Sequence, residues 1–333
     1  MSDRPQSGEG DIIERYFAPL AADTPGAFNL TDDAGLINPP DGMDIVMTTD
    51  VIVSGVHFLD QTTPEDVAYK ALAVNVSDLC AKGAEPAVYL LSLSLPGNPD
   101  PAWLGGLRHG LAEAQDTFGC TLLGGDTVAT PGPVTLSITA AGFVPEGRMV
   151  HRDGAGEGDT VYVTGTIGDA VLGLKLFQPP DIAPEGLSDA QRDFLRNRYL
   201  RPRPRLASIE PVRLHTSASM DVSDGLVGDF VKLCRASSVG GIIEADKVPL
   251  SDAATLWVEK DSDILEELLS GGDDYEILQT VPETAAAAFE DDCRRAGVDV
   301  TAIGRIVAAD EGVRVRDGQG NEIAMSRKSY AHF

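Results

Sequence analysis

Positive charge is scarce in this 333-residue chain. Lysine and arginine together number 26 against 52 aspartates and glutamates, which gives a formal net charge of −26 at pH 7. A protein that binds nucleic acid or an anionic membrane needs a basic surface, because binding displaces the cations that surround phosphate groups. The charge balance therefore argues against a nucleic-acid partner and against a membrane partner.

Long apolar runs and paired cysteines are also absent. A membrane-spanning helix needs about 20 consecutive apolar residues, and residues 1–10 are polar, unlike a secretory leader. We therefore expect a cytoplasmic protein. The four cysteines lie far apart and form no C-x-x-C pair, which argues against disulfides and against a zinc site. The sequence also lacks a G-x-x-x-x-G-K-[ST] phosphate loop and a G-x-S-x-G nucleophile motif.

The composition permits a substantial core, with 43% hydrophobic residues of which few are aromatic. The length predicts two domains. Predicted strands and helices are mixed along the chain, as in an α/β or α+β fold, and the glycine-rich, charged residues 147–158 are typical of a joint. We therefore divide the chain into residues 1–148 and 149–333.

Local patterns predict several individual elements. Asp11 to Leu20 has helical spacing of apolar residues, and the helix from Thr63 to Lys82 has a capping threonine, a proline in its first turn and a closing glycine. Further expected elements are a strand over 45–49 ending at Asp50, a helix from Asp100-Pro101 to about Phe118, a tight turn over 124–127 and a strand over 275–281.

Aspartates gather beside predicted strand ends and small residues. Each one alone is more typical of a turn than of a site, but a converging set would repel unless a cation compensated the charge. Oxygen ligands without cysteine or histidine favour Mg²⁺, which is usually held by one or two carboxylates together with substrate phosphates. The pattern therefore predicts a Mg²⁺-using phosphate enzyme. The members of this set are Asp32, Asp33, Asp50, Asp78, Asp126, Asp221, Asp224, Asp273 and Asp274.

Several longer motifs, taken in order, resemble the thiamine-monophosphate kinase family. The resemblance runs from about residue 11 to the C-terminal Tyr330-Ala331-His332-Phe333. The motifs are MTTD at 47–50, GVHF at 55–58, YKALAVNVSD at 69–78, GAEP at 83–86, GGDT at 124–127, YVTGT at 162–166, DVSDGL at 221–226 and SGGDDYE at 270–276.

This resemblance implies a two-domain aminoimidazole ribonucleotide synthetase-like fold, also found in selenophosphate synthetase. Its N-terminal α/β domain would bind ATP and Mg²⁺ and form a homodimer through its strands, and an α+β domain would follow. The implied reaction is direct in-line transfer of a phosphoryl group from ATP to thiamine monophosphate, assisted by several Mg²⁺ ions. The acceptor oxygen belongs to a phosphate that is already ionised, so positioning and electrostatics would supply the catalysis.

Matching positions also imply roles for individual residues. ATP would contact Gly125, Asp126, Arg152 and Ser223, with Asp126 and Arg152 as the catalytic pair. The acceptor would meet His57, Asp273 and Arg327. The implied Mg²⁺ ligands are Asp33, Thr48, Thr49, Asp50, Asp78, Asp126, Asp221 and Asp224.

Three positions depart from the family pattern. Thr31 replaces the glycine before the first Asp-Asp pair, Asp273 replaces a glutamate, and Arg327 replaces an aromatic residue expected to pack on the substrate rings. Two rival interpretations stay open. One is another ATP-using enzyme of the same superfamily with a different acceptor, and the other is a non-catalytic acidic protein that binds divalent cations.

Overall fold

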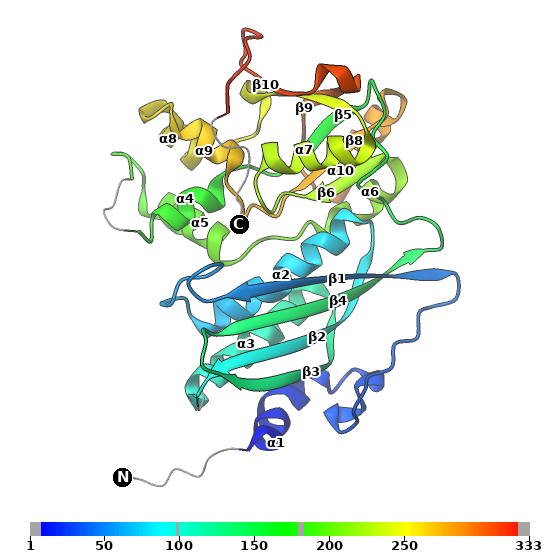
Figure 1. Cartoon of the computed structure of the whole chain (residues 1–333), viewed down its shortest axis with the longest axis vertical. Helices are drawn as coiled ribbons and strands as arrows, with labels where there is room; N and C mark the ends of the chain where they lie inside the picture. Colours follow the sequence, from blue (N-terminus) through cyan, green and yellow to red (C-terminus); the bar gives the residue numbers. More distant parts are fainter. Residues whose placement is uncertain (1–7, 98–99, 179–182, 326–333) are drawn as a thin grey trace. The chain divides into compact units, whose positions relative to one another are not determined.

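We describe the protein from a computed structural model, which covers residues 8–97, 100–178 and 183–325. The chain divides into two units, each drawn in Figure 1. Unit 1 comprises the residues up to Leu79 together with Glu85–Gly147, and unit 2 comprises Cys80–Ala84 and the residues from Arg148 onward. None of the helices in the covered ranges is long and apolar enough to cross a membrane.

Unit 1 is built on a four-stranded sheet. The strand order is β1-β4-β2-β3, and all neighbours are antiparallel except β2 and β3, which run parallel. The strands are β1 (Met43–Val53), β2 (Glu85–Pro96), β3 (Thr121–Thr130) and β4 (Thr135–Pro145). Gly124 to Thr127 lie inside β3, so the prediction of a tight turn there is wrong.

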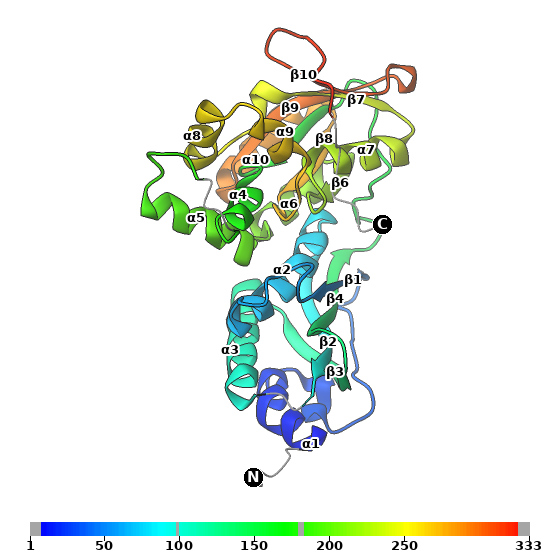
Figure 2. The ribbon, with the colours of Figure 1, turned by 60° about the vertical axis from the view of Figure 1, so that its left-hand side comes forward.

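Helices α2 (Pro64–Ala81) and α3 (Pro101–Phe118) cover one face of this sheet, and none of the described helices of unit 1 covers the opposite face (Figure 2). Both helices match the sequence predictions, because their ends are specified locally. The Thr63 hydroxyl accepts a hydrogen bond from Asp66 N at the start of α2, and the Asp100 carboxylate accepts one from Ala102 N at the start of α3. Gly119, in the left-handed conformation, ends α3.

The N-terminal segment differs from its prediction as one helix over 11–20. It contains α1 (Glu9–Ile12), a π-helical turn (Ile13–Phe17) and two 3₁₀ segments (Ala18–Ala21 and Pro25–Leu30). Pro19 has no N–H to donate, so a regular α-helical ladder cannot continue through it. The apolar side chains of Tyr16, Phe17 and Leu20 are nevertheless buried, so the periodicity identified the buried face correctly.

Unit 2 contains a six-stranded sheet of order β10-β7-β9-β5-β8-β6. Its strands are β5 (Thr160–Thr164), β6 (Ala218–Asp221), β7 (Gly240–Glu244), β8 (Ile277–Val281), β9 (Val300–Val307) and β10 (Val313–Arg316). Its helices are α4 (Asp169–Lys175), α5 (Asp189–Leu200), α6 (Ile209–His215), α7 (Leu226–Ser237), α8 (Asp252–Lys260), α9 (Ile264–Ser270) and α10 (Ala286–Ala296).

Both faces of the unit 2 sheet are buried. Side chains alternate along β5, so that Val161 and Val163 join a core with Phe230 of α7, while Tyr162 packs against Phe289 of α10 with ring centroids 5.0 Å apart. A separate apolar cluster joins α4, α5, α8 and α9 around Trp257. The family's α+β expectation for this half of the chain agrees with the structure.

Candidate active site

A cavity in unit 1 lies at the β3 edge of the sheet and has a volume of about 710 Å³. Apolar side chains of the N-terminal segment, including Ile13 and Phe17, line one side of it. Asp32 and Asp33 line it from the loop after that segment, and Asp126 lines it from β3. A cavity with an apolar wall and a few convergent polar groups is the usual form of a small-molecule site.

Gly125, next to Asp126, lies where β2 and β3 approach each other closely. A Cβ atom at Gly125 would lie only 2.0 Å from the backbone oxygen of Leu91. The glycine is therefore required by the close approach of two strands and not by a turn. Sequence patterns associate Gly-Gly-Asp with turns, which explains why the prediction for residues 124–127 was wrong.

Three predicted ligands lie together on the α2 side of β1, and we call them the α2 group: Thr48, Asp50 and Asp78. The Thr48 hydroxyl donates to a carboxylate oxygen of Asp78 over 2.5 Å. Asp50 N donates to Asn75 Oδ1 at 3.0 Å, and Asn75 Nδ2 donates to Ala71 O at 3.0 Å, which fixes the buried amide. Asn75 therefore orients the backbone of β1 beside these ligands.

Other predicted residues lie on the opposite face of the same sheet. The register pairs Asp126 with Ser92, Ser92 with Ser137 and Ser137 with Val51, so these side chains share one face. Thr49 shares that face, where its hydroxyl accepts a hydrogen bond from Thr139 at 3.1 Å. Val46 and Ile52, which alternate with these residues along β1, are buried, whereas Met47 and Val51 are exposed. The shared face is therefore the one that α2 and α3 leave uncovered in Figure 2. Unit 1 thus carries the α2 group on one face of its sheet and a pocket group of Asp33, Gly125 and Asp126 along the cavity. Thr49 belongs to neither group.

The predicted donors suit a Mg²⁺ ion whose shell is completed by other ligands. Within the covered part of the chain, no three histidine, cysteine, aspartate or glutamate side chains converge so as to hold a metal ion by themselves. The predicted donors are carboxylate and hydroxyl oxygens, which are the ligands of hard cations. Mg²⁺ is commonly held by one or two carboxylates with water and substrate phosphates completing the shell, and these residues fit that arrangement.

His57 lies in the tight turn after β1. Val53 N donates to its Nδ1 at 3.1 Å, so Nδ1 is the acceptor and Nε2 carries the proton of the neutral ring. The turn is closed by a hydrogen bond from Gly55 N to Phe58 O at 2.8 Å, and Phe58 is buried. The imidazole is therefore held in one orientation by the backbone of its own turn.

In unit 2, the residues 222–225 form a loop between β6, which ends at Asp221, and α7. Asp229, in the first turn of α7, is fully buried, and its carboxylate accepts hydrogen bonds from Ser223 N at 3.0 Å and from Asp224 N at 2.9 Å. Burial raises the pKa of Asp229, and Lys232 Nζ, 2.8 Å away, opposes that shift. Lys232 also forms an ion pair with Asp224.

Asp229 and Lys232 were missed by the sequence reasoning. The available signal was an aspartate in the first helical turn after the DVSDG motif, followed by a lysine on the same helical face three residues later. Such a pair is common on solvated helices, so only the structure shows that Asp229 supports the backbone of the predicted ligands.

The second acidic motif of unit 2 packs directly against this loop. Asp273 N donates to Ser223 O and Tyr275 N donates to Val222 O, both at 2.9 Å. Both Asp273 (φ 73°) and Tyr275 (φ 51°) have left-handed backbones, so β8 begins only at Ile277 and not at Tyr275 as predicted. The structure therefore brings the predicted ATP ligand Ser223 and the predicted acceptor residue Asp273 together.

The remaining predicted residues are placed less specifically. Asp221 is buried at the end of β6. Arg152 is exposed, and its backbone carbonyl accepts a hydrogen bond from Ser237 Oγ at 3.2 Å. Arg327 and Tyr330 lie outside the described residues.

Comparison with known proteins assigns the chain to a family. The domain models described as AIR synthase related protein match residues 31–144 (N-terminal domain) and 156–316 (C-terminal domain). The chain is 39% identical over 328 residues to the thiamine-monophosphate kinase of Escherichia coli K12, covering 98% of each chain. It is 40% identical over 327 residues to that of Caulobacter vibrioides, covering 97% of this chain and 90% of the other. This chain belongs to the thiamine-monophosphate kinase family.

Solved structures of the thiamine-monophosphate kinase family agree with this assignment. The crystal structure from Stenotrophomonas maltophilia K279a is 37% identical, with a TM-score of 0.78 over 86% of this chain and 89% of that chain. The structure described as AaThiL complexed with AMPPCP and TMP is 32% identical, with a TM-score of 0.76 over 100% and 99%. Hydrogenase maturation protein HypE with ATP shares the fold alone, at 17% identity and a TM-score of 0.75 over 96% and 94%.

Proposed function

We propose that this chain transfers a phosphoryl group from ATP to thiamine monophosphate and forms thiamine diphosphate. The observation that carries the proposal is its full-length similarity to thiamine-monophosphate kinases, including a relative whose structure is described with AMPPCP and TMP. The acidic motifs of both units, 47–50, 69–78, 124–127, 221–226 and 270–276, all fall within that aligned length.

Mg²⁺ is part of this proposal. The ligands would come from Asp33, Thr48, Thr49, Asp50, Asp78, Asp126, Asp221 and Asp224. When bound, Mg²⁺ would neutralise the phosphate charge that ATP and the acceptor bring together. The chain's own residues would align the two phosphates: Gly125, Asp126, Arg152 and Ser223 on the nucleotide, and His57, Asp273 and Arg327 on the acceptor.

The residues suit in-line transfer because the reaction needs no strong base. The attacking phosphate oxygen is already ionised near neutral pH, so alignment and charge compensation supply the rate enhancement. Arg152 would stabilise the charge that develops on the transferred group. The rigid supports described above, Asn75 under β1 and Asp229 under residues 223–224, would hold the ligands in place before the substrates bind.

A homodimer and a cytoplasmic location belong to the same proposal. The helix-free face of unit 1 exposes apolar side chains, with Met47 62%, Val51 46%, Ile45 38% and Leu90 38% exposed. A contiguous apolar surface of this kind is typical of a contact between subunits, and two copies can bury it by packing sheet against sheet. ATP as the donor favours the cytoplasm.

The decisive test is product formation with Mg-ATP and thiamine monophosphate, comparing the wild type with Asp126→Asn. We expect equal amounts of ADP and thiamine diphosphate from the wild type, and a loss of about a hundredfold or more in the variant, because a charged ligand next to the reacting phosphates is removed. Mg-ATP binding without any turnover of thiamine monophosphate would refute the proposed acceptor and indicate another member of the superfamily. Mg²⁺ binding without ATP binding would indicate a cation-binding protein instead.

A further inference from the structure

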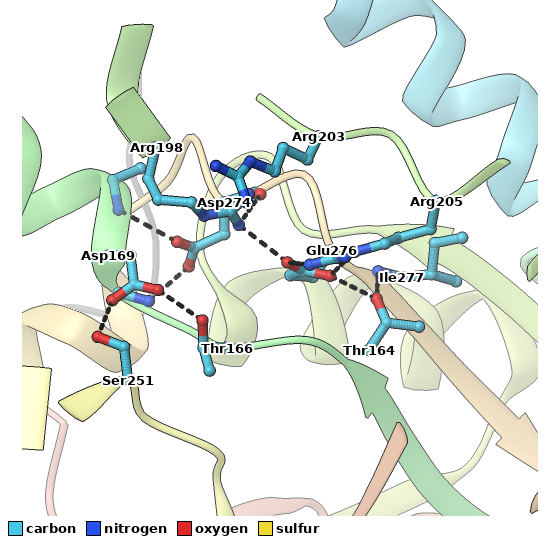
Figure 3. Close-up of polar contacts among 12 residues, drawn as sticks. Thr164, Thr166, Asp169, Arg198, Arg203, Arg205, Ser251, Asp274, Glu276 and Ile277 are labelled. Carbon is cyan, nitrogen blue, oxygen red and sulfur yellow. Dashed lines mark hydrogen bonds and ion pairs between the residues drawn. The ribbon is translucent and has the colours of Figure 1, made fainter. Parts of the chain in front are cut away.

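Five acidic and basic residues gather in the interior of unit 2, where hydrogen bonds and ion pairs hold them (Figure 3). We call this set the buried charge network: Asp169, Arg198, Arg205, Asp274 and Glu276. Asp169, Asp274 and Glu276 have at most 1% of their surface exposed, and Arg198 has 2%. None of these residues is assigned a role in the proposed reaction, so the question is what the network holds in place.

Glu276 is fixed by three separate parts of the chain. Its carboxylate accepts hydrogen bonds from Arg198 Nη2 of α5 at 2.8 Å, from Arg205 Nε at 2.6 Å and from the Thr164 hydroxyl of β5 at 2.6 Å. Arg205 makes a second contact through Nη2. Thr164 Oγ1 also accepts a hydrogen bond from Ile277 N at 2.8 Å, the first residue of β8.

Asp274 is fixed from the opposite side. Its carboxylate accepts hydrogen bonds from Gly168 N at 2.8 Å and Ala170 N at 3.5 Å, at the start of α4. Its backbone oxygen accepts one from Arg198 Nη2 at 3.1 Å. Nε and Nη1 of Arg198 have no hydrogen-bond partner among the residues that the structure describes. Nη2 is therefore the atom through which Arg198 contacts both the Asp274 backbone and the Glu276 carboxylate.

The two residues on either side of Asp274 have an unfavourable backbone conformation. Asp273 and Tyr275 alternate with Asp274 and Glu276, and both have positive φ, a conformation that side chains other than glycine rarely adopt because Cβ crowds the backbone. Such strain persists only where the surroundings hold it, and it is common at functional sites. The alternation also leaves Asp273 and Tyr275 partly exposed while Asp274 and Glu276 are buried.

The same segment is fixed on its other side to the loop over 222–225. Besides the two backbone hydrogen bonds from Asp273 and Tyr275, Val222 N donates to Glu276 O at 2.8 Å. Gly272 passes so close that a Cβ atom there would lie 2.2 Å from Ser223 O. Asp273 is therefore held between a hydrogen-bonded loop and a set of buried ion pairs.

We infer that Arg198, Asp274 and Glu276 are positioning residues that hold Asp273 in the conformation in which it binds the acceptor substrate. This inference rests on the proposed function for the identity of that acceptor. The network acts first on Asp273, so disrupting it should lower the affinity for the acceptor more than the affinity for the nucleotide, because the predicted nucleotide ligand Ser223 is reached only through backbone hydrogen bonds. A network that only stabilised the fold would change neither affinity selectively.

The first experiment uses the full-length protein with Glu276→Gln, which keeps the shape of the side chain and removes its charge. The matched control is Glu290→Gln, because Glu290 also accepts a side-chain hydrogen bond in unit 2, from Tyr162 at 2.7 Å, but lies outside the network. We expect Glu276→Gln to raise KM for thiamine monophosphate about tenfold, with the Kd for Mg-ATP changed less than about threefold. The control should change neither value.

A double-mutant cycle tests whether the effect passes through Asp273. In an Asp273→Ala background, Glu276→Gln should raise the acceptor KM by less than about threefold, because the group it positions is gone. An equal factor in both backgrounds would overturn the inference, and so would an equal loss of Mg-ATP affinity. If the Glu276→Gln variant does not fold, the Arg205→Lys variant is used in the same experiment. The side chain of Arg205 is 28% exposed, and lysine keeps the charge but cannot contact the Glu276 carboxylate through two nitrogens.

Hydrogen exchange separates this inference from the proposed function, because it needs no substrate. Amides in the peptide that spans residues 270–276 should exchange about tenfold faster in Glu276→Gln than in the wild type or in the control. Unchanged exchange would overturn the positioning role. A wild type that forms no thiamine diphosphate would refute the proposed function while the exchange result still decides the inference.

Discussion

Replacing Gly125 with alanine should damage the pocket of unit 1 in a predictable way. The new Cβ would lie 2.0 Å from Leu91 O, whereas a carbon and a carbonyl oxygen in neighbouring strands approach to about 3.3 Å at the closest. The obstacle is backbone, so no side chain can rotate away. The two strands must therefore separate by roughly 1.3 Å at this point, against a normal spacing of about 4.8 Å.

Two effects follow from that separation. Overpacking of this kind costs about 1–3 kcal/mol, which corresponds to a fall in Tm of roughly 2–12 °C. Asp126 moves with its neighbour, and a displacement of about 1 Å at a reacting group costs on the order of a hundredfold in rate. Thermal unfolding and the rate of ADP formation measure the two effects separately.

Gly124→Ala is the matched control, because a Cβ there meets only Leu90 Cδ2, at 3.3 Å. That atom is the end of a flexible side chain and can yield by a few tenths of an ångström. The control should keep its Tm within about 2 °C of the wild type and most of its activity. Equal behaviour of the two variants, or a fully stable and active Gly125→Ala protein, would refute the account of the strand contact.

Three further predictions concern other parts of the chain. Asp229→Asn should lower the free energy of unfolding by about 1–3 kcal/mol and weaken Mg-ATP binding, because an amide cannot replace the charge that faces Lys232. Urea unfolding measures the first effect and calorimetry the second. An unchanged Mg-ATP affinity would contradict the supporting role of Asp229. The hydrogen bond from His215 lowers the pKa of Asp292 from its ordinary value of 3.8, so the stability it contributes is present above that value and is lost as pH falls through the folded-state pKa. Unfolding midpoints should therefore depend less on acid pH in Asp292→Asn than in the wild type, and equal profiles would count against the pair. Met47→Asp should convert a dimer to a monomer by light scattering, and a wild-type monomer would show that the proposed dimer is wrong.

Sequence patterns predicted elements whose ends are specified locally. The helices α2 and α3 begin at capping residues and prolines and end at glycines, so a window of a few residues determines them. The same reasoning was wrong at Gly124 to Thr127 and at Tyr275. In the first case a glycine serves the approach of a strand that is distant in sequence, and in the second the left-handed backbone is imposed by hydrogen bonds to residues 222 and 223.

In the candidate site, too, residues in local motifs could be predicted, and residues that depend on distant partners could not. Family motifs supplied the predicted ligands, and the predicted helix over 63–82 contains Asp78, as α2 does in the structure. The supporting residues Asp229, Arg198 and Glu276 could not be assigned from sequence, because their roles depend on burial and on partners up to 78 positions away. Buried ion pairs of this kind leave no local pattern.

The helix-free face of unit 1 carries both the exposed apolar side chains around Met47 and the Asp126 of the pocket group. A partner copy packed on that face would cover the surroundings of the pocket, so dimerisation and nucleotide binding would be thermodynamically linked. By mass action, activity per chain would then fall on dilution below the dimer Kd, and saturating Mg-ATP would shift the midpoint of that loss to lower protein concentration. The amount of the protein in the cell would thereby become a control on how much of it is active.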